Sequence, residues 1–322
     1  MSELNLTGQE MPLSALTSPS DDPVQQSHAT RYRFVDVDGS RVFLREAGNP
    51  EAPTVLLLHG APTSSFQFRH LIPALADRYH VVAPDYPGFG FTDVPTWNAE
   101  RPVTFDALAD TVERLTDVLG LRRFALYLFD YGAPVGFRLA ERRPERVAAL
   151  ILQNGNAFLE GLGPAWAPVR AYWADPSPAR RDALRGLFTE EGLRDQYLRG
   201  EPDPSRIAPE CWMLDKALVE RPGVVEVQLD LLLDYRHNLE CYPLWQAFMR
   251  NHQRPALVTW GRNDDFFPPP GAEAYRRVLH DVEFHLLDAG HFALESNGER
   301  IASLMHDFLD RKVAPRDDPA LH

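Results

Sequence analysis

Phe124-Ala-Leu-Tyr-Leu-Phe-Asp130-Tyr-Gly132-Ala-Pro134 joins an apolar run to a helical segment across very few residues. The run from Phe124 to Phe129 is rich in β-forming residues, which is typical of a strand buried on both faces. The segment from Pro134 to Arg142 has the composition of a helix. Asp130 stands at the turn between them, so we expect its carboxylate to project above the sheet, where a helix N-terminus favours an anion.

Asp130 at this turn allows two interpretations. An aspartate after a strand commonly caps the next helix, and Asp130 considered alone favours that role. The same pattern is also that of a nucleophile elbow, with a carboxylate where serine usually stands. Gly132 and Ala133 are small enough for the strand and the helix to pack closely. The residues that follow two later strands favour the elbow.

Strands and helices alternate along much of the chain, with short links between them. Expected strands are 31–35 and 41–45, which flank the turn signal Asp38-Gly39, then 54–58, 79–83, 124–129, 147–153, 256–260 and 282–287. Expected helices are 66–76, 104–120, 134–142, 270–279 and a final helix with apolar residues at Ile301, Leu304, Met305, Phe308 and Leu309. This alternation predicts an α/β fold with a doubly wound, mostly parallel sheet.

The alternation is interrupted by one long segment. Residues 154–250 contain no strand-like apolar run and hold four of the six tryptophans. We interpret them as a helical cap over the sheet edge at which doubly wound folds bind ligands. The core is then formed by residues 29–153 and 251–313. Residues 1–28 are rich in Ser, Thr, Asp, Gln and Pro and are expected to form a disordered tail, with a C-terminal tail at 314–322.

Composition bears on partners and location. The 322 residues carry 46 acidic and 33 basic side chains, a net charge of −13, which argues against nucleic acid and anionic membranes as partners. No apolar run approaches the roughly 20 residues that a membrane-spanning helix needs. Cys211 and Cys241 are too few for a disulfide framework, and a cytoplasmic location is expected. The glycine-rich segment Asp85–Gly90 lacks the spacing of a phosphate-binding loop and is interpreted as a turn, so no metal or cofactor is expected.

Two more polar residues follow expected strand ends. Asp264 lies just after the strand 256–260, and His291 lies just after the strand 282–287. Each has an ordinary interpretation as a loop residue. Because parallel strands end at one edge of a sheet, we expect Asp130, Asp264 and His291 to lie together as nucleophile, acid and base.

Five motifs together carry a family resemblance: His59-Gly-Ala-Pro62, Asp85-Tyr-Pro-Gly-Phe-Gly90, Asp130-Tyr-Gly132, Trp260-Gly-Arg-Asn-Asp264 and Gly290-His-Phe292. On these motifs the chain resembles the α/β-hydrolase superfamily over about Arg31 to Arg311. The aspartate nucleophile is similar to that of the branch containing epoxide hydrolases and haloalkane dehalogenases. The resemblance implies that the backbone N–H groups of Ala61 and Tyr131 form an oxyanion hole and that the helical segment is a cap.

The acid of the triad has more than one candidate. Related enzymes sometimes place it after the strand that ends near Gln153, but here that turn is Asn154-Gly155-Asn156. Because an amide cannot hold an imidazolium by charge, we predict Asp264 as the acid, with Asp265 as the second candidate.

An aspartate nucleophile restricts the reaction. It attacks a saturated carbon that bears a leaving group and forms an ester, which His291, oriented by Asp264, would hydrolyse by activating water. Opening an epoxide produces an alkoxide that needs an acidic O–H nearby, whereas a halide needs donors that cradle an anion. Dehalogenases of this branch normally have Trp after the nucleophile and often Asn within the first motif, where this chain has Tyr131 and Ala61.

The resemblance also indicates which cap residues would open an epoxide. Epoxide hydrolases normally place two cap tyrosines over the nucleophile, and the later one is matched by Tyr235 in Asp234-Tyr-Arg-His-Asn238. The earlier position falls near Val169, with Tyr172 and Trp173 one turn further on. We therefore predict Tyr235 as the acid, with Trp173 or Tyr172 as the second donor. The remaining tryptophans of the segment are interpreted as packing residues: Trp166, Trp212 and Trp245.

The sequence thus predicts a cofactor-independent epoxide hydrolase that makes a vicinal diol through an ester on Asp130. A haloalkane dehalogenase with the same triad is the alternative, and a non-catalytic ligand-binding homologue is a weaker one. A serine esterase is disfavoured because no GxSxG motif occurs. The expected partners are a small apolar substrate and water, and a homodimer stays open.

Overall fold

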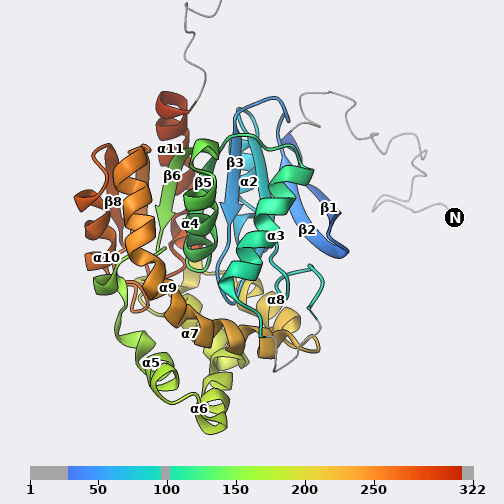
Figure 1. Cartoon of the computed structure of the whole chain (residues 1–322), viewed down its shortest axis with the longest axis vertical. Helices are drawn as coiled ribbons and strands as arrows, with labels where there is room; N and C mark the ends of the chain where they lie inside the picture. The colour runs from blue at the N-terminus through green and yellow to red at the C-terminus, as the bar shows by residue number, and fades with distance from the viewer. Residues whose placement is uncertain (1–27, 96–101, 314–322) are drawn as a thin grey trace, which may run out of the picture.

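A sheet of eight strands runs through the centre of the computed structural model, which describes residues 28–95 and 102–313 (Figure 1). The strands are β1 (Arg31–Val37), β2 (Ser40–Ala47), β3 (Thr54–Leu58), β4 (His80–Pro84), β5 (Phe124–Phe129), β6 (Val147–Gln153), β7 (Ala256–Gly261) and β8 (Val282–Leu287). They lie in the order β1-β2-β4-β3-β5-β6-β7-β8. Pairing is antiparallel for β1 with β2 and for β2 with β4, and parallel elsewhere, which confirms the predicted mostly parallel sheet.

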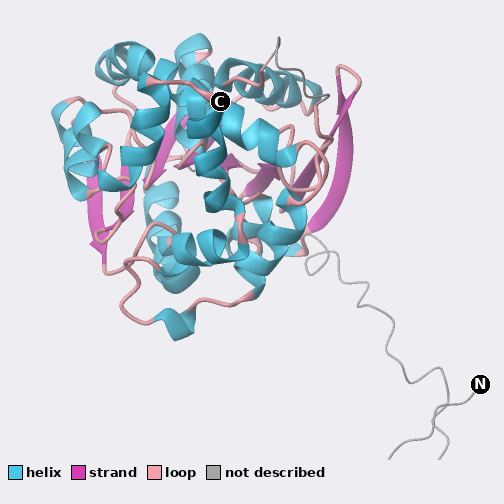
Figure 2. Cartoon of the chain, turned by 90° about the horizontal axis from the view of Figure 1, so that it is seen from below, coloured by secondary structure: helices cyan, strands magenta, loops and turns pink. Residues whose placement is uncertain are grey.

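Helices cover both faces of this sheet (Figure 2). Those beside the sheet are α2 (Leu71–Leu75), α3 (Phe105–Val118), α4 (Gly132–Arg142), α10 (Pro269–Ala274) and α11 (Ala293–Lys312). Successive strand residues point to opposite faces, so Leu56 of β3 packs with apolar residues of α3 and α4. Its neighbour Leu57 packs with those of α2 and α11. Two apolar cores therefore hold the sheet between its helices.

Two predicted helices are interrupted in the structure. Residues 66–76 form a 3₁₀ turn, Ser65–Phe68, followed by the separate helix α2. The prediction of one continuous helix is wrong here because Pro73 has no N–H and its ring opposes the carbonyl of Arg69, four residues earlier. Residues 270–279 divide into α10 and a 3₁₀ turn at Tyr275–Arg277. The other predicted core elements are confirmed to within a few residues.

The helical insert, residues 154–255, lies between β6 and β7 at the carboxyl ends of the parallel strands (Figure 1). Its α-helices are α5 (Ala167–Ala174), α6 (Pro178–Ala183), α7 (Glu190–Leu198), α8 (Glu210–Val219) and α9 (Val224–His252). Asp234 of α9 accepts a hydrogen bond from the N–H of Phe105 at 2.8 Å, and Arg138 donates to Asn238 at 2.7 Å. These contacts join α9 to the start of α3 and to α4.

The described residues give only partial information on membrane-spanning segments, the cysteines, the tails and the location of the protein. Within 28–95 and 102–313, no helix is both long enough and apolar enough to cross a membrane. Cys211 and Cys241 are free thiols. Apart from His28, the two predicted tails lie outside the described residues. The cytoplasmic location stays a prediction.

Candidate active site

Asp130 lies on a sharp turn between β5 and α4. Its φ of 47° is in the left-handed region that few non-glycine residues adopt. A Cβ on Gly132 would lie 2.2 Å from the carbonyl oxygen of Leu58, and one on Gly60 would lie 2.4 Å from Cβ of Asp130. Both positions therefore need glycine. The turn carries the Asp130 side chain to the end of β3, as expected for an elbow rather than for a simple cap.

Backbone N–H groups hold the carboxylate of Asp130. The N–H of Ala61 donates to Oδ1 at 2.7 Å, and a backbone hydrogen bond from Tyr131 also stabilises the carboxylate. These are the two groups that the sequence assigned to an oxyanion hole. Burial raises the pKa of Asp130 to about 6, although the charge of His291 and both N–H groups act to lower it. The side chain is therefore an anion at neutral pH.

His59 fixes the loop that presents Ala61. Its Nε2 accepts a hydrogen bond from the N–H of Tyr86 at 3.3 Å, so Nδ1 carries the proton and donates to the carbonyl of Gly60 at 2.8 Å. Burial lowers the pKa of His59 to about 4, so the ring is neutral and can fill both roles. The first two sequence motifs thus meet in space and position one N–H group.

His291, just after β8, reaches both acidic residues of the triad. Its Nδ1 lies 2.8 Å from Oδ2 of Asp264, and its Nε2 lies 3.8 Å from Oδ2 of Asp130. Burial acts to lower the pKa of His291, but the charges of Asp264 and Asp130 more than offset it, so the pKa is raised. The contact with Asp264 sets the tautomer and leaves Nε2 facing Asp130. The sequence prediction brought together these same three residues.

Asn154 holds Asp264 in place, a role that the sequence reading did not assign. Its Nδ2 donates to Oδ2 of Asp264 at 2.8 Å, and its Oδ1 accepts from the N–H of Gly261 at 3.0 Å. The other oxygen of Asp264 accepts from the N–H of Phe266 at 2.7 Å. Asn154 follows β6 and has a φ of 47°, so an asparagine at a strand end was the available signal.

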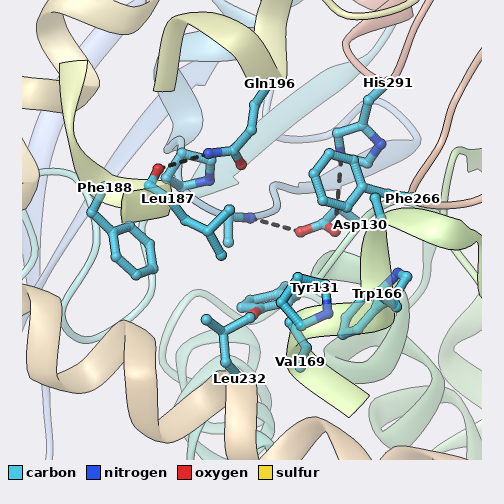
Figure 3. Close-up of a pocket in the computed structure, with 14 residues that line it drawn as sticks. Asp130, Tyr131, Trp166, Val169, Leu187, Phe188, Gln196, Leu232, Phe266 and His291 are labelled. Carbon is cyan, nitrogen blue, oxygen red and sulfur yellow. Dashed lines mark hydrogen bonds and ion pairs between the residues drawn. The ribbon is translucent and has the colours of Figure 1, made fainter. Parts of the chain in front are cut away.

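A cavity lies in front of Asp130 and His291 (Figure 3). Its volume is about 590 Å³ when the space at its open mouth is included. Core and insert both contribute to its wall, which is formed by Ala61, Pro62, Asp130, Tyr131, Ala165, Trp166, Pro168, Val169, Leu187, Phe188, Gln196, Leu232, Phe266 and His291. None of these lining residues is Lys or Arg. The wall is mainly apolar with a few polar groups, as in small-molecule sites.

The three predicted insert donors lie outside this wall. Tyr235 is fully buried behind it, with its hydroxyl 3.5 Å from that of Tyr242. The indole N–H of Trp173 donates to the carbonyl of Leu232 at 2.7 Å and is therefore committed to the backbone. Tyr172 is buried, and its hydroxyl accepts from Arg181 at 3.4 Å. None of the three predicted donors, Tyr235, Trp173 and Tyr172, lines the cavity, contrary to the expectation that they face the substrate.

Trp166 was interpreted as a packing residue, yet it lines the cavity. Its ring centroid lies 4.3 Å from that of Tyr235 and 5.7 Å from that of Trp173. Among the described residues, its buried Nε1 has no hydrogen-bond partner. A buried N–H group without a partner is uncommon and calls for an explanation. Val169, at the predicted position of an earlier tyrosine, also lines the wall, so that position faces the cavity with an apolar side chain.

The comparison with protein families identifies the class. The family model described as alpha/beta hydrolase fold matches residues 53–298, which is most of the chain. The match spans the elbow, the helical insert and the strands that carry Asp264 and His291. The chain belongs to the α/β-hydrolase family.

Individual relatives include both predicted branches. An uncharacterised hydrolase of Saccharomyces cerevisiae is 44% identical over 278 residues, covering 84% of this chain and 94% of that protein. Haloalkane dehalogenase 2 of Mycobacterium tuberculosis is 29% identical over 290 residues, covering 87% of this chain and 96% of that protein. Epoxide hydrolase A of the same species is 34% identical over 177 residues, covering 53% of this chain and 51% of that protein. This chain is therefore a hydrolase related to epoxide hydrolases and haloalkane dehalogenases.

Proposed function

We propose that this chain is an epoxide hydrolase that converts an epoxide into a vicinal diol through an ester on Asp130. The observation that carries the proposal is that the two oxygens of Asp130 are held differently. Oδ1 accepts the N–H of Ala61 at 2.7 Å, whereas Oδ2 lies 3.8 Å from Nε2 of His291, beside the cavity. One oxygen is suited to an oxyanion hole and the other to attack. The helical insert would act as the cap.

In the first step, Oδ2 of Asp130 attacks one carbon of the epoxide. A new C–O bond forms to Asp130, the bond from that carbon to the ring oxygen breaks, and the ring oxygen takes a proton from an acidic O–H group. The product is an ester whose carbonyl oxygen is Oδ1. This oxygen keeps the N–H of Ala61, so the oxyanion hole is already aligned for the next step.

In the second step, Nε2 of His291 takes a proton from water, and the water oxygen adds to the ester carbon. The resulting negative charge on Oδ1 is stabilised by the N–H groups of Ala61 and Tyr131, at a typical gain of roughly 3 kcal/mol per donor. The bond from the carboxyl carbon of Asp130 to the ester oxygen then breaks. That oxygen, the former Oδ2, leaves with the substrate and takes the proton from His291. Asp264 stabilises the imidazolium between these events.

The ring oxygen needs donors in the cavity wall. Tyr131 lines the cavity, and within the described residues its hydroxyl has no hydrogen-bond partner, so we assign it as the proton donor. Burial, followed by the charge of Asp130, raises the pKa of Tyr131 well above its ordinary value, which keeps the phenol protonated. Trp166 can add a hydrogen bond but cannot release a proton at neutral pH. Tyr235, the acid expected from sequence, is the alternative because its ring lies against both.

A haloalkane dehalogenase is the second candidate, supported by the unpartnered indole N–H of Trp166 and by the relative that bears that name. A halide would have this N–H group but would lack a tryptophan at position 131 and an asparagine at position 61. Haloacids are a poorer fit, since a carboxylate substrate needs a cation and no Lys or Arg lines the cavity.

The test is to incubate the purified chain with styrene oxide and, separately, with 1-bromobutane. We expect phenylethanediol from the first and little or no bromide from the second. In a single turnover in ¹⁸O-labelled water, the label should first enter the Asp130 carboxylate, because water attacks the carbonyl carbon of the ester. Bromide without diol would favour the dehalogenase, and label absent from Asp130 would exclude the ester mechanism for both.

A further inference from the structure

Among the described residues that line the cavity, Gln196 is the one polar side chain to which the proposed chemistry gives no role. It lies on α7, in the insert, and faces the cavity together with Leu187 and Phe188. The other lining residues with polar side-chain atoms are the nucleophile, the base, Tyr131 and Trp166. Gln196 therefore stands in an otherwise apolar part of the wall.

The amide of Gln196 is held in one orientation. Its Nε2 lies 2.8 Å from the carbonyl oxygen of Leu187 and 3.1 Å from that of Gly192. Both neighbours are acceptors, so the NH₂ group must face them and the amide oxygen must point the other way. Figure 3 shows this arrangement, with the nitrogen turned to Leu187 and Oε1 turned toward the space before Asp130 and His291. Within the described residues, Oε1 receives no hydrogen bond.

A fixed acceptor in an apolar wall discriminates between substrates. A wholly apolar substrate would cover Oε1 and remove it from water without offering a partner, which is unfavourable. A substrate with a hydroxyl group at the right distance would donate a hydrogen bond to it. A positively charged substituent would find no carboxylate to pair with at Gln196, and an anionic substituent would be repelled by the amide oxygen.

We propose that Gln196 selects epoxides whose substituent carries a neutral hydrogen-bond donor, so that the substrate class is epoxy alcohols rather than plain alkyl or aryl epoxides. The inference rests on the proposed epoxide hydrolase function and adds the substrate class to it. Gln196 is here a specificity-determining residue, since it does not touch the reacting atoms.

The test uses terminal epoxides with a hydroxyl group one to four carbons from the ring. Each is paired with the epoxide in which methyl replaces the hydroxyl and with the methyl ether, which can accept but cannot donate. For at least one chain length, we expect kcat/KM for the alcohol to exceed that of both partners by about tenfold. Gln196→Met should abolish this preference, mainly through KM for the alcohol.

Gln246→Met is the matched control. Gln246 also donates from its amide to a backbone carbonyl, that of Ala157 at 2.9 Å, and it does not line the cavity. This variant should keep the preference. If Gln196→Met is unstable, the methyl ethers still test the inference in the unaltered chain. Equal turnover of the hydroxyl-bearing epoxide, its methyl analogue and its methyl ether would overturn the inference but leave the hydrolase function standing. Absence of diol from every epoxide would overturn both.

Discussion

The core side and the insert side of the cavity hold their polar groups in different ways. On the core side, Asp130, Asp264 and His291 each come shortly after a parallel strand, and hydrogen bonds to backbone or to Asn154 support the two carboxylates. On the insert side, Trp166 and Gln196 come from helices joined by loops. The groups to which we assign the chemistry therefore lie where the sheet dictates their position. The groups to which we assign substrate selection lie where position depends on the packing of helices.

The largest effect should come from the core side. We expect Asp130→Asn and His291→Gln each to lower turnover by at least about 10⁴-fold. The two differ in which step they stop. His291→Gln can still form the ester, so its intact mass should rise by one substrate molecule, whereas Asp130→Asn should show no adduct. Unaltered turnover by His291→Gln would break the division between attack and hydrolysis.

The next largest effect should distinguish Tyr131, which lines the cavity on the core side, from Tyr235, which lies buried behind the wall on the insert side. We expect Tyr131→Phe to lower kcat by about 10²-fold or more, as for loss of a general acid, and Tyr235→Phe to lower it by less than tenfold. Both variants remove only a hydroxyl from a buried ring, so each is a control for the other. Steady-state kinetics on styrene oxide decide the order. The reverse order would return the role of acid to Tyr235 and to the insert.

The acid side of the pH profile should report the buried nucleophile. Attack needs the Asp130 carboxylate, whose pKa is raised to about 6, and water activation needs neutral His291, whose pKa is also raised. Since kcat/KM reports the attack step, protonation of Asp130 should lower it by about tenfold per pH unit below pH 6. Protonation of His291 should slow hydrolysis of the ester and so lower kcat at acidic pH as well. Measuring kcat/KM from pH 5 to 8 tests this. Full activity at pH 5 would mean that burial does not control the nucleophile.

The smallest effect should distinguish two tryptophans within the insert. Trp166→Phe removes an N–H without a partner among the described residues, so we expect kcat/KM to fall three- to tenfold with little change in thermal stability. Trp173→Phe removes the hydrogen bond to Leu232, so stability should fall by about 1 kcal/mol with activity nearly unchanged. Activity assays and thermal melts on both variants check the contrast. The opposite pattern would give Trp173 the ligand role.

The predictable part of the site follows the strands. An apolar run followed by Asp130, and the polar residues that follow β7 and β8, sufficed to place the triad, because parallel strands carry their ends to one edge. The need for a small residue at Gly132 was also predicted, and a Cβ there would lie 2.2 Å from the carbonyl oxygen of Leu58. Asn154 was missed because its contact with Asp264 depends on pairing between β6 and β7 rather than on a motif.

In the insert, the local sequence pattern does not predict where a side chain lies in the folded structure. Trp166 and Trp173 are both aromatic residues on neighbouring turns, and nothing in their spacing says which indole faces the cavity. The packing of α5 against α9 decides it, because the carbonyl of Leu232 accepts the N–H of Trp173, whereas the N–H of Trp166 has no partner among the described residues. The chain order of residue types thus specified a hydrolase and the three side chains, Asp130, Asp264 and His291, that meet at one edge of the sheet. Only the folded arrangement of helices decided which side chains of the insert line the cavity, since their contacts join residues far apart along the chain.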